Sequence, residues 1–376
     1  MTIARWVCLS LVSACTADLA HADGSVTLYG VLDESIQYVR NTGGQRTQIG
    51  LQHNNWLVSR LGLKGSEDIG GGNSVIFRLE SGFNMNTGAL GGSNQLFGRA
   101  AYVGINSTRY GELTFGQHLL LLNALVGPIQ GNWYFGFSAA PGDVDLADGA
   151  IKMSNAVQWL SPVWSGLQIG ATYAFGNHAG GAGSDQSYAA AFNYTSGPLR
   201  IAAGYVHADN GNPLVSARGT GNASAVFFSP ANSAYSSARA YDVVRAGIAY
   251  DVGPVTLGGY YSLSDYHPDS WSSFRHPEIY NNVSLYAYWK MSPALSSEIG
   301  VDYMRSHGDS SAIYRTVVVS AGYSLSKTTD LYAAIGYGRA FGQNGNGEAR
   351  AAIGDDWPAA GGASQALAFI GINHRF

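Results

Sequence analysis

Apolar and polar residues alternate at a period of two along most of this chain, in segments of about ten residues separated by turns. In residues 25–36 one face carries Leu28, Leu32 and Ile36, and the other carries Tyr29, Asp33 and Ser35. A tilted strand of about ten residues crosses the hydrocarbon layer of a membrane, with one face in lipid and the other in water. The alternation therefore predicts an all-β, transmembrane antiparallel β-barrel.

The alternating segments, bounded by Gly, Asn and Pro, predict about sixteen strands, an even number as bacterial barrels have. We place them near residues 25–36, 60–64, 75–80, 97–106, 111–117, 154–161, 166–176, 187–196, 199–208, 240–252, 254–264, 280–290, 296–306, 314–324, 329–339 and 366–376. The last segment puts Ala366, Ala368, Ile370, Ile372 and Phe376 on one face and is expected to close the barrel.

The turns alternate between short and long. Short turns are expected at 66–73, 196–198, 253–254, 292–294 and 326–328, and long polar ones at 209–239, 265–279 and 341–364. This alternation suits a barrel with short periplasmic turns and long external loops. The longest irregular stretch, 118–152, follows the fifth strand, and a segment of that length inside a compact barrel is expected to be functional.

Aromatic residues cluster near the predicted strand ends, where they are expected to form girdles at the two membrane interfaces. The candidates are Tyr194, Tyr250, Tyr288, Trp289, Tyr323, Tyr332 and Tyr337. Ordinary aromatic pairing between neighbouring strands is the alternative.

Composition excludes several other classes of protein. Only 12% of the 376 residues are charged, about half the usual fraction, whereas glycine (50 residues) and tyrosine (23 residues) are abundant. No apolar run after the N-terminus reaches the roughly 18 residues of a membrane-spanning helix. The formal net charge of -4 gives no basic surface for nucleic acid.

The N-terminus has the pattern of an export signal. Arg5 supplies a positive charge, residues 6–12 are mostly apolar, and Ala20-His21-Ala22 fits the small-x-small cleavage rule. We expect residues 1–22 to be a cleaved signal peptide and 23–376 to form the barrel domain. Val12-Ser13-Ala14-Cys15 also resembles a lipoprotein box, which stays open as an alternative.

Catalytic and cofactor chemistry finds little support in the sequence. Both cysteines, Cys8 and Cys15, lie inside the signal, so the mature chain is expected to have no disulfide, thiolate nucleophile or cysteine-bound zinc. The scattered histidines show no metal-binding spacing, and no nucleophile-elbow motif occurs. We therefore expect neither an enzyme nor a metal or other cofactor.

Several stretches resemble the general diffusion porins of Gram-negative bacteria, in the β-proteobacterial branch of Burkholderia, Bordetella and Neisseria. The matching stretches are 25–33, 59–72, 79–84, 96–104 and 371–376. The resemblance implies a sixteen-stranded barrel in the outer membrane, a homotrimer surrounded by lipid and lipopolysaccharide, and a third loop folded into the lumen. It implies passive diffusion of small hydrophilic solutes and ions.

The third loop departs from the family pattern. Gln117 follows Gly116 where the family usually has a basic residue, and residues 118–126 are unusually apolar. This apolar run is expected to form a short helix, packed either on the barrel wall or at a contact between subunits.

A diffusion pore needs cations on one wall and carboxylates facing them, because such a field orients dipolar solutes. By alternation Arg60, Arg78 and Arg99 point inward on adjacent strands, and Arg60 and Arg99 match the family's basic cluster. Lys64 and Lys152 are expected to extend this basic wall. The acidic candidates are Glu80, beside Arg78, and the loop residues Asp143, Asp145 and Asp148. The arginines favour a weak anion preference.

Two alternatives remain beside the general porin. An outer-membrane enzyme would need a Ser/His or Asp/His set, which the sequence does not show at recognisable spacing. A substrate-specific channel or an adhesin on the same barrel fits the altered third loop. A sugar channel should carry aromatic residues through the lumen, and residues 133–135 could begin such a path, although three adjacent residues cannot all face one way.

The signal-peptide assignment predicts that the mature protein begins at Asp23. N-terminal sequencing of protein extracted from outer membranes should read Asp-Gly-Ser-Val. A blocked N-terminus at Cys15 carrying lipid would instead establish the lipoprotein alternative.

Overall fold

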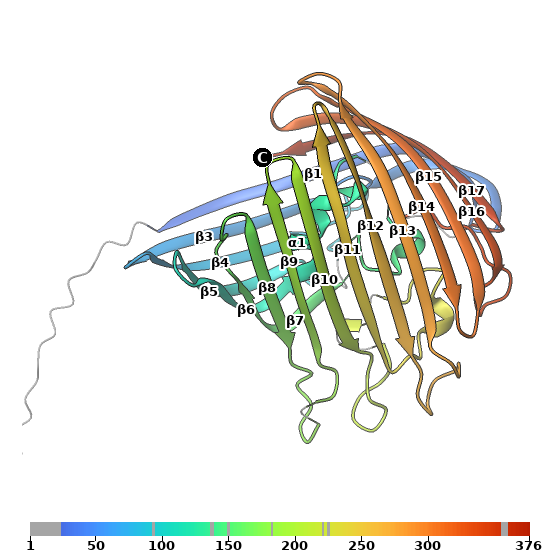
Figure 1. The fold of residues 1–376 in the computed structure, drawn as a ribbon, viewed down its shortest axis with the longest axis horizontal. Helices are drawn as coiled ribbons and strands as arrows, with labels where there is room; N and C mark the ends of the chain where they lie inside the picture. Colours follow the sequence, from blue (N-terminus) through green and yellow to red (C-terminus); the bar gives the residue numbers. More distant parts are fainter. Residues whose placement is uncertain are drawn as a thin grey trace, which may run out of the picture.

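The computed structural model describes residues 24–91, 95–135, 139–148, 151–181, 183–219, 222–223, 226–354 and 360–376 (Figure 1). The expected signal peptide, residues 1–22, lies outside this part of the chain. Within it, no helix is long and apolar enough to cross a bilayer.

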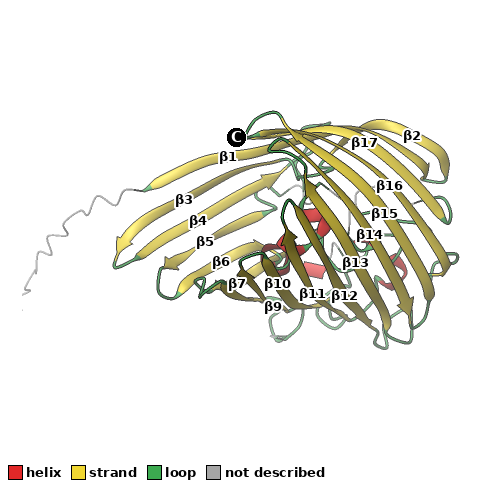
Figure 2. Cartoon of the chain, turned by 45° about the horizontal axis from the view of Figure 1, so that its top comes forward, coloured by secondary structure: helices red, strands yellow, loops and turns green. Residues whose placement is uncertain are grey.

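Seventeen strand segments form one antiparallel sheet that closes on itself (Figure 2). They are β1 (Ser25–Thr42), β2 (Gln45–His53), β3 (Arg60–Gly70), β4 (Asn73–Gly82), β5 (Ala100–Ser107), β6 (Gly111–Leu119), β7 (Lys152–Leu160), β8 (Leu167–Ala174), β9 (Ser187–Ser196), β10 (Leu199–Asp209), β11 (Ala240–Val252), β12 (Val255–His267), β13 (Glu278–Lys290), β14 (Leu295–His307), β15 (Ser311–Ser324), β16 (Thr329–Gln343) and β17 (Ser364–Arg375).

The first and last strands close the barrel. Val31 to Arg40 of β1 pair with Ala366 to Arg375 of β17. The terminal residue extends this seam. The Phe376 amide donates to the Gly30 carbonyl at 3.1 Å, and the Gly30 amide donates to the Phe376 carbonyl at 3.0 Å. The expected closing strand is therefore confirmed. Closure matters because an open sheet edge would leave backbone groups unpaired in hydrocarbon.

The seventeen segments make sixteen barrel strands. Both β2 and β3 pair with the same edge of β1, β2 with its second half and β3 with its first half, so together they form one interrupted strand. The sequence-based list omitted β2 and ended β1 at Ile36. The omission has a physical cause: β2 has only two apolar side chains on its outer face, Ile49 and Leu51, too few for a clear alternation.

Asp33 of β1 satisfies the backbone where the second strand is interrupted, at residues 54–59. Its buried carboxylate accepts bonds from the amides of Trp56 and Leu57, both at 3.3 Å. The same carboxylate accepts the Tyr332 hydroxyl at 2.7 Å and the Asn373 amide at 3.0 Å. One side chain therefore joins β1, the interruption, β16 and β17.

The outward faces are as the alternation predicted. Leu28 and Ile36 are each 58% exposed, whereas Asp33 and Ser35 point inward and are buried. Among the expected girdle residues, Tyr250, Trp289, Tyr323 and Tyr337 are exposed on the outer face. The girdle prediction is wrong for Tyr288 and Tyr332. Both side chains point into the barrel, because each residue lies one position along the strand from an outward-facing one.

The connections alternate in length as expected. Short turns fall at 71–72, 197–198, 253–254, 291–294 and 325–328, all at one end of the barrel. Long connections at 210–239, 268–277 and 344–363 lie at the other end. Two connections at the long-loop end are short, the two-residue β1–β2 turn, Gly43-Gly44, and the three-residue β14–β15 turn, 308–310.

The junction at Asp33 predicts that Asp33→Ala destabilises the barrel, because two amides and two side-chain donors lose their acceptor. Leaving buried donors unpaired costs about 1–3 kcal/mol each. Samples are heated to a series of temperatures before gel electrophoresis, in which folded and unfolded barrels migrate differently. The folded band of the variant should convert to the unfolded band at a lower temperature than that of the wild type. Glu34→Ala, next to it on the outward face, is the control, and equal effects of the two variants would contradict the assigned role.

Candidate pore constriction

Three arginines converge on one buried carboxylate on the inner wall of β3 to β5. Glu80 of β4 is fully buried; its Oε2 lies 2.5 Å from an Arg78 nitrogen and its Oε1 2.7 Å from Arg99 Nε. Arg60 Nε lies 3.8 Å from Oε2. The three arginines that the sequence places inward on adjacent strands meet here at one carboxylate. We refer to Arg60, Arg78, Arg99 and Glu80 as the arginine cluster.

Tyr29 holds the cluster from β1, and a glycine makes room for it. The Tyr29 hydroxyl donates to Glu80 Oε2 at 2.7 Å and accepts from Arg78 Nε at 2.8 Å. Gly62 lies between the two on β3, paired with Tyr29 on one side and Glu80 on the other. A Cβ at Gly62 would come within 2.4 Å of the Tyr29 ring, so any side chain there would push the ring away.

Glu80 therefore lies at the centre of the arginine cluster. It is not a carboxylate on the opposite wall of the lumen. Its single charge leaves an excess of positive charge from the three guanidiniums. Their side chains are 15–34% exposed, so the cluster contacts solvent. Lys64 adjoins it, with Nζ 5.4 Å from the centre of the Tyr29 ring. Lys152 lies at the start of β7, half-buried and paired with Leu119.

Between β6 and β7 the structure describes residues 120–135, 139–148 and 151, which pack against the inside of the barrel; we call them the inner segment. The segment contains α1 (Leu121–Leu125) and three short 3-10 turns, η1 (Gly127–Ile129), η2 (Gly131–Trp133) and η3 (Pro141–Asp143). In both overall views the helix lies within the ring of strands (Figures 1 and 2). The unusual apolar run is explained by this packing, since Leu121, Leu122 and Leu125 are buried against β8, β9 and β10.

Small residues on the inner wall make this packing possible. A Cβ at Gly204 would lie 2.7 Å from Leu122, and one at Gly170 would lie 2.8 Å from Leu121. A Cβ at Gly247 would lie 2.7 Å from Ile129. The apolar run was expected to pack either on the barrel wall or at a contact between subunits. In the structure it packs on the wall of its own barrel.

Polar side chains on β11 to β13 hold the rest of the inner segment. Arg245, fully buried, donates to Gln130 at 3.1 Å and to Asn123 at 2.6 Å. Tyr286 donates to the Ile129 carbonyl at 3.1 Å, and Tyr266 to the Val144 carbonyl at 3.2 Å. Sequence reasoning missed Arg245, although its place among inward-facing residues of β11 was the available signal.

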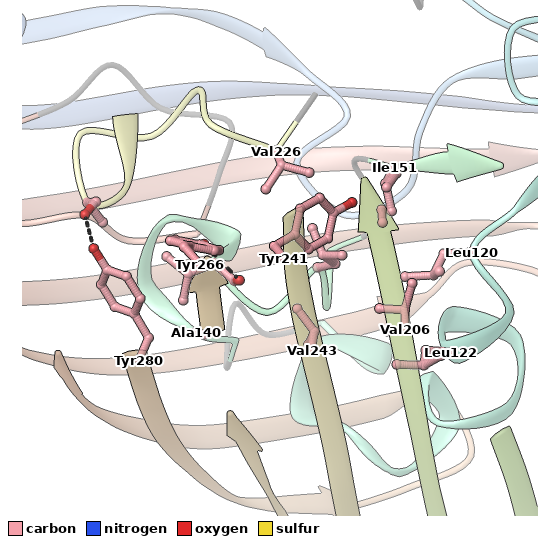
Figure 3. Packing of buried hydrophobic residues seen from close by; sticks show 14 of the residues in the cluster. Leu120, Leu122, Ala140, Ile151, Val206, Val226, Tyr241, Val243, Tyr266 and Tyr280 are labelled. Carbon is pink, nitrogen blue, oxygen red and sulfur yellow. Dashed lines mark hydrogen bonds between the residues drawn. The ribbon is translucent and has the colours of Figure 1, made fainter. Parts of the chain in front are cut away.

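A second loop covers the inner segment. Tyr280 donates to the Ala231 carbonyl at 2.7 Å, and Asn344 donates to the Pro230 carbonyl at 2.6 Å. Figure 3 shows the hydrogen bond of Tyr280 and, in the same buried apolar cluster, Tyr266, Ala140 and Val226. Part of the connection expected as an external loop, 209–239, therefore folds inward, because its alanines and Val226 join the buried apolar cluster.

The three loop aspartates are not free solvated charges, although Asp148 is only half-buried. Asp143 and Asp145 are fully buried, Asp143 Oδ1 accepts the Asp148 amide at 2.9 Å, and Asp148 accepts Asn132 Nδ2 at 2.7 Å. Burial, together with the neighbouring Asp145, raises the pKa of Asp148 to about 6 and raises the pKa of Asp143 well above its ordinary value. Arg245 is the cation that acts on both.

The aspartates and the arginine cluster lie on opposite sides of the barrel. The segment that carries the aspartates bonds to Tyr260 of β12 and Tyr266, whereas the cluster is on β3 to β5. The strand order puts β4 and β12 eight barrel strands apart, half of the way around. Among the described residues, no group of three or more His, Cys, Asp or Glu could hold a metal ion.

Comparison with known proteins agrees with this geometry. The family model described as Gram-negative porin matches residues 9–343. The chain belongs to the Gram-negative porin family. An outer membrane porin of Bordetella pertussis is 29% identical over 86% of this chain and 91% of its own. Outer membrane porin protein 32 of Delftia acidovorans is 31% identical over 52% of this chain and 58% of its own.

Solved structures show the same fold. The anion-selective porin from Comamonas acidovorans superposes with a TM-score of 0.69 at 21% identity, over 94% of this chain and all of that chain. The trimer form of OmpT from Vibrio cholerae gives 0.66 at 14% identity, over 94% of this chain and 99% of that chain. This porin is thus a channel of the Gram-negative outer membrane and not an enzyme.

The raised pKa of Asp148 predicts a pH-dependent selectivity of this porin. Protonation below about pH 6 removes negative charge beside Asn132, Asp145 and Arg245, so anion preference should increase between pH 7.5 and pH 5. The pKa of Asp148 is higher in the folded chain than in the unfolded chain, so the folded chain binds more protons. The stability of the packed inner segment should therefore increase as the pH falls through this range.

Reversal potentials under a salt gradient at the two pH values measure this effect. Asp148→Asn should be more anion-selective than the wild type at pH 7.5 and should change less on acidification. A pH response of equal size in Asp148→Asn would show that other groups cause it.

Proposed function

We propose that this porin passes small hydrophilic solutes and ions passively, with a weak preference for anions. The observation that carries the proposal is the convergence of Arg60, Arg78 and Arg99 on a single carboxylate, Glu80. Guanidinium groups stay charged at every physiological pH and bind anions through paired donors. The similar porin from Comamonas acidovorans is described as anion-selective, which supports the sign of the preference.

We propose that the lumen carries a transverse field between the arginine cluster and the inner segment. Positive charge gathers on β3 to β5, and Asp143, Asp145 and Asp148 lie on the far side. Such a field aligns water and dipolar solutes and disfavours apolar ones. The aspartates contribute less than exposed carboxylates would, because Arg245 compensates them and acid pH neutralises Asp143 and Asp148.

We propose that the protein works as a homotrimer among lipid and lipopolysaccharide. A structure of the same fold is described as a trimer form. The outward face of β1, β16 and β17 offers a broad apolar surface in which Ile36, Ile335 and Ile370 are each about 60% exposed. Such a surface suits lipid or a second copy of the chain.

A substrate-specific channel on the same barrel is the second candidate. One observation favours it: Tyr134 and Phe135 of the inner segment contact aromatic rings from the barrel wall. No comparable observation supports an adhesin or an outer-membrane enzyme.

The triple variant Arg60→Gln, Arg78→Gln and Arg99→Gln tests the proposed function. Removing three positive charges leaves Glu80 uncompensated, so the reversal potential under a salt gradient should shift towards cation selectivity. Arg315→Gln, an exposed arginine on the outer face of β15, is the matched control and should not shift it. An unchanged reversal potential in the triple variant would mean that the cluster does not set the pore field.

A further inference from the structure

Six aromatic rings from four parts of the chain form a connected array inside the barrel. Trp56 comes from the strand interruption, Tyr134 and Phe135 from the inner segment, Tyr286 and Tyr288 from β13, and Tyr332 from β16. We call these residues the lumenal aromatic array. Sequence reasoning treated two of them, Tyr288 and Tyr332, as membrane girdle residues.

Ring contacts run continuously through the array. Trp56 lies 5.8 Å from Tyr332 and 4.6 Å from Phe135, centre to centre. Phe135 lies 6.4 Å from Tyr288. Tyr288 is stacked on Tyr134 at 4.1 Å with 16° between the planes, and Tyr134 lies 5.7 Å from Tyr286. The four longer separations lie in the range at which aromatic pairs attract one another, and Tyr288 and Tyr134 are stacked more closely than that.

Part of the array holds the inner segment, and part of it is open. Tyr286 and Tyr332 are buried, and their hydroxyls bond to Ile129 and Asp33. Trp56, Tyr134, Phe135 and Tyr288 are only half-buried. Trp133, which precedes Tyr134 on the inner segment, is 55% exposed. Packing alone does not account for aromatic surface left in contact with water inside a barrel.

Cations border the open part of the array. Arg200 of β10 donates to the Tyr134 hydroxyl at 3.3 Å, and the Arg375 guanidinium lies 5.6 Å from the Trp56 ring. Arg60 of the arginine cluster donates to the Val58 carbonyl at 3.1 Å, two residues along the interruption from Trp56. Arg200 and Arg375 are themselves paired with Asp251 and Asp330, so the excess of positive charge near the array comes from the arginine cluster.

We propose that the lumenal aromatic array and the adjoining arginines bind aromatic carboxylates on their way through the channel. The flat ring stacks on the face of Tyr288 or Tyr134 that the other ring leaves open, or on Trp133 beside the array, and the carboxylate lies towards the guanidiniums. Binding is brief, since conduction requires that a solute enter and also leave. The inference rests on the proposed function, because it needs a conducting lumen with an excess of positive charge.

Block of the ion current by benzoate tests this inference, with cyclohexanecarboxylate as a probe of matched charge and size. Single-channel current through the wild type in potassium chloride should fall with benzoate at a concentration about threefold or more below that needed for cyclohexanecarboxylate. An aromatic contact adds about 0.5–1.5 kcal/mol beyond buried area, which corresponds to a factor of this size.

Variants separate binding from structural support. Tyr288→Leu and Trp133→Ala should each remove most of the preference for benzoate, and Tyr288→Phe should keep it because the ring remains. Trp289→Leu, on the outward face of the same strand, is the control and should behave as the wild type. Equal block by the two acids, or a preference that survives Tyr288→Leu and Trp133→Ala, would overturn the inference.

The outcomes also distinguish this inference from the proposed function. A wild type that conducts with anion preference but shows no preference for benzoate would overturn the aromatic site alone. A wild type that does not conduct would overturn both.

Discussion

Barrel closure is the constraint on which the rest of the structure depends. Hydrocarbon offers no partner to a backbone amide or carbonyl, so every spanning strand must be paired on both edges. The pairing of β1 with β17 and, on its other edge, with β2 and β3 meets this requirement. The interruption at residues 54–59 is tolerated because Asp33 supplies acceptors for the freed amides from inside the barrel. That local solution also brings Trp56 next to Phe135 and Arg375.

The inner segment converts a plain barrel into a channel with two unlike sides. Leucines fill the notches left by Gly170 and Gly204. Arg245 holds the side chains of Asn123 and Gln130, and three tyrosines hold the backbone that follows. The packing occupies the β8 to β15 side of the lumen, so the partly exposed arginine cluster faces it from β3 to β5. Selectivity in this account comes from an asymmetric arrangement of charge, with no reaction centre.

The sequence predicted the parts that depend on local alternation. A period of two is enough to assign Arg60, Arg78 and Arg99 inward and Leu28 and Ile36 outward. It failed where the deciding contact is distant in sequence or where few side chains carry the pattern. The strand β2 has too little apolar surface. The lumenal position of Tyr288 depends on the phase of the alternation at the end of β13, where an error of one residue exchanges the two faces. The burial of Asp143 and the central place of Glu80 among three arginines depend on strands that meet only in the folded barrel.

Planar-bilayer recording of the detergent-extracted wild-type protein under a salt gradient is the most direct test of an open, weakly anion-selective pore. Such a pore should give large ohmic steps that close in three equal substates, with a reversal potential of the sign given by anion preference. Small or absent conductance would contradict it, because the inner segment would then plug the lumen. A cation-selective reversal potential would contradict the assigned role of the arginine cluster.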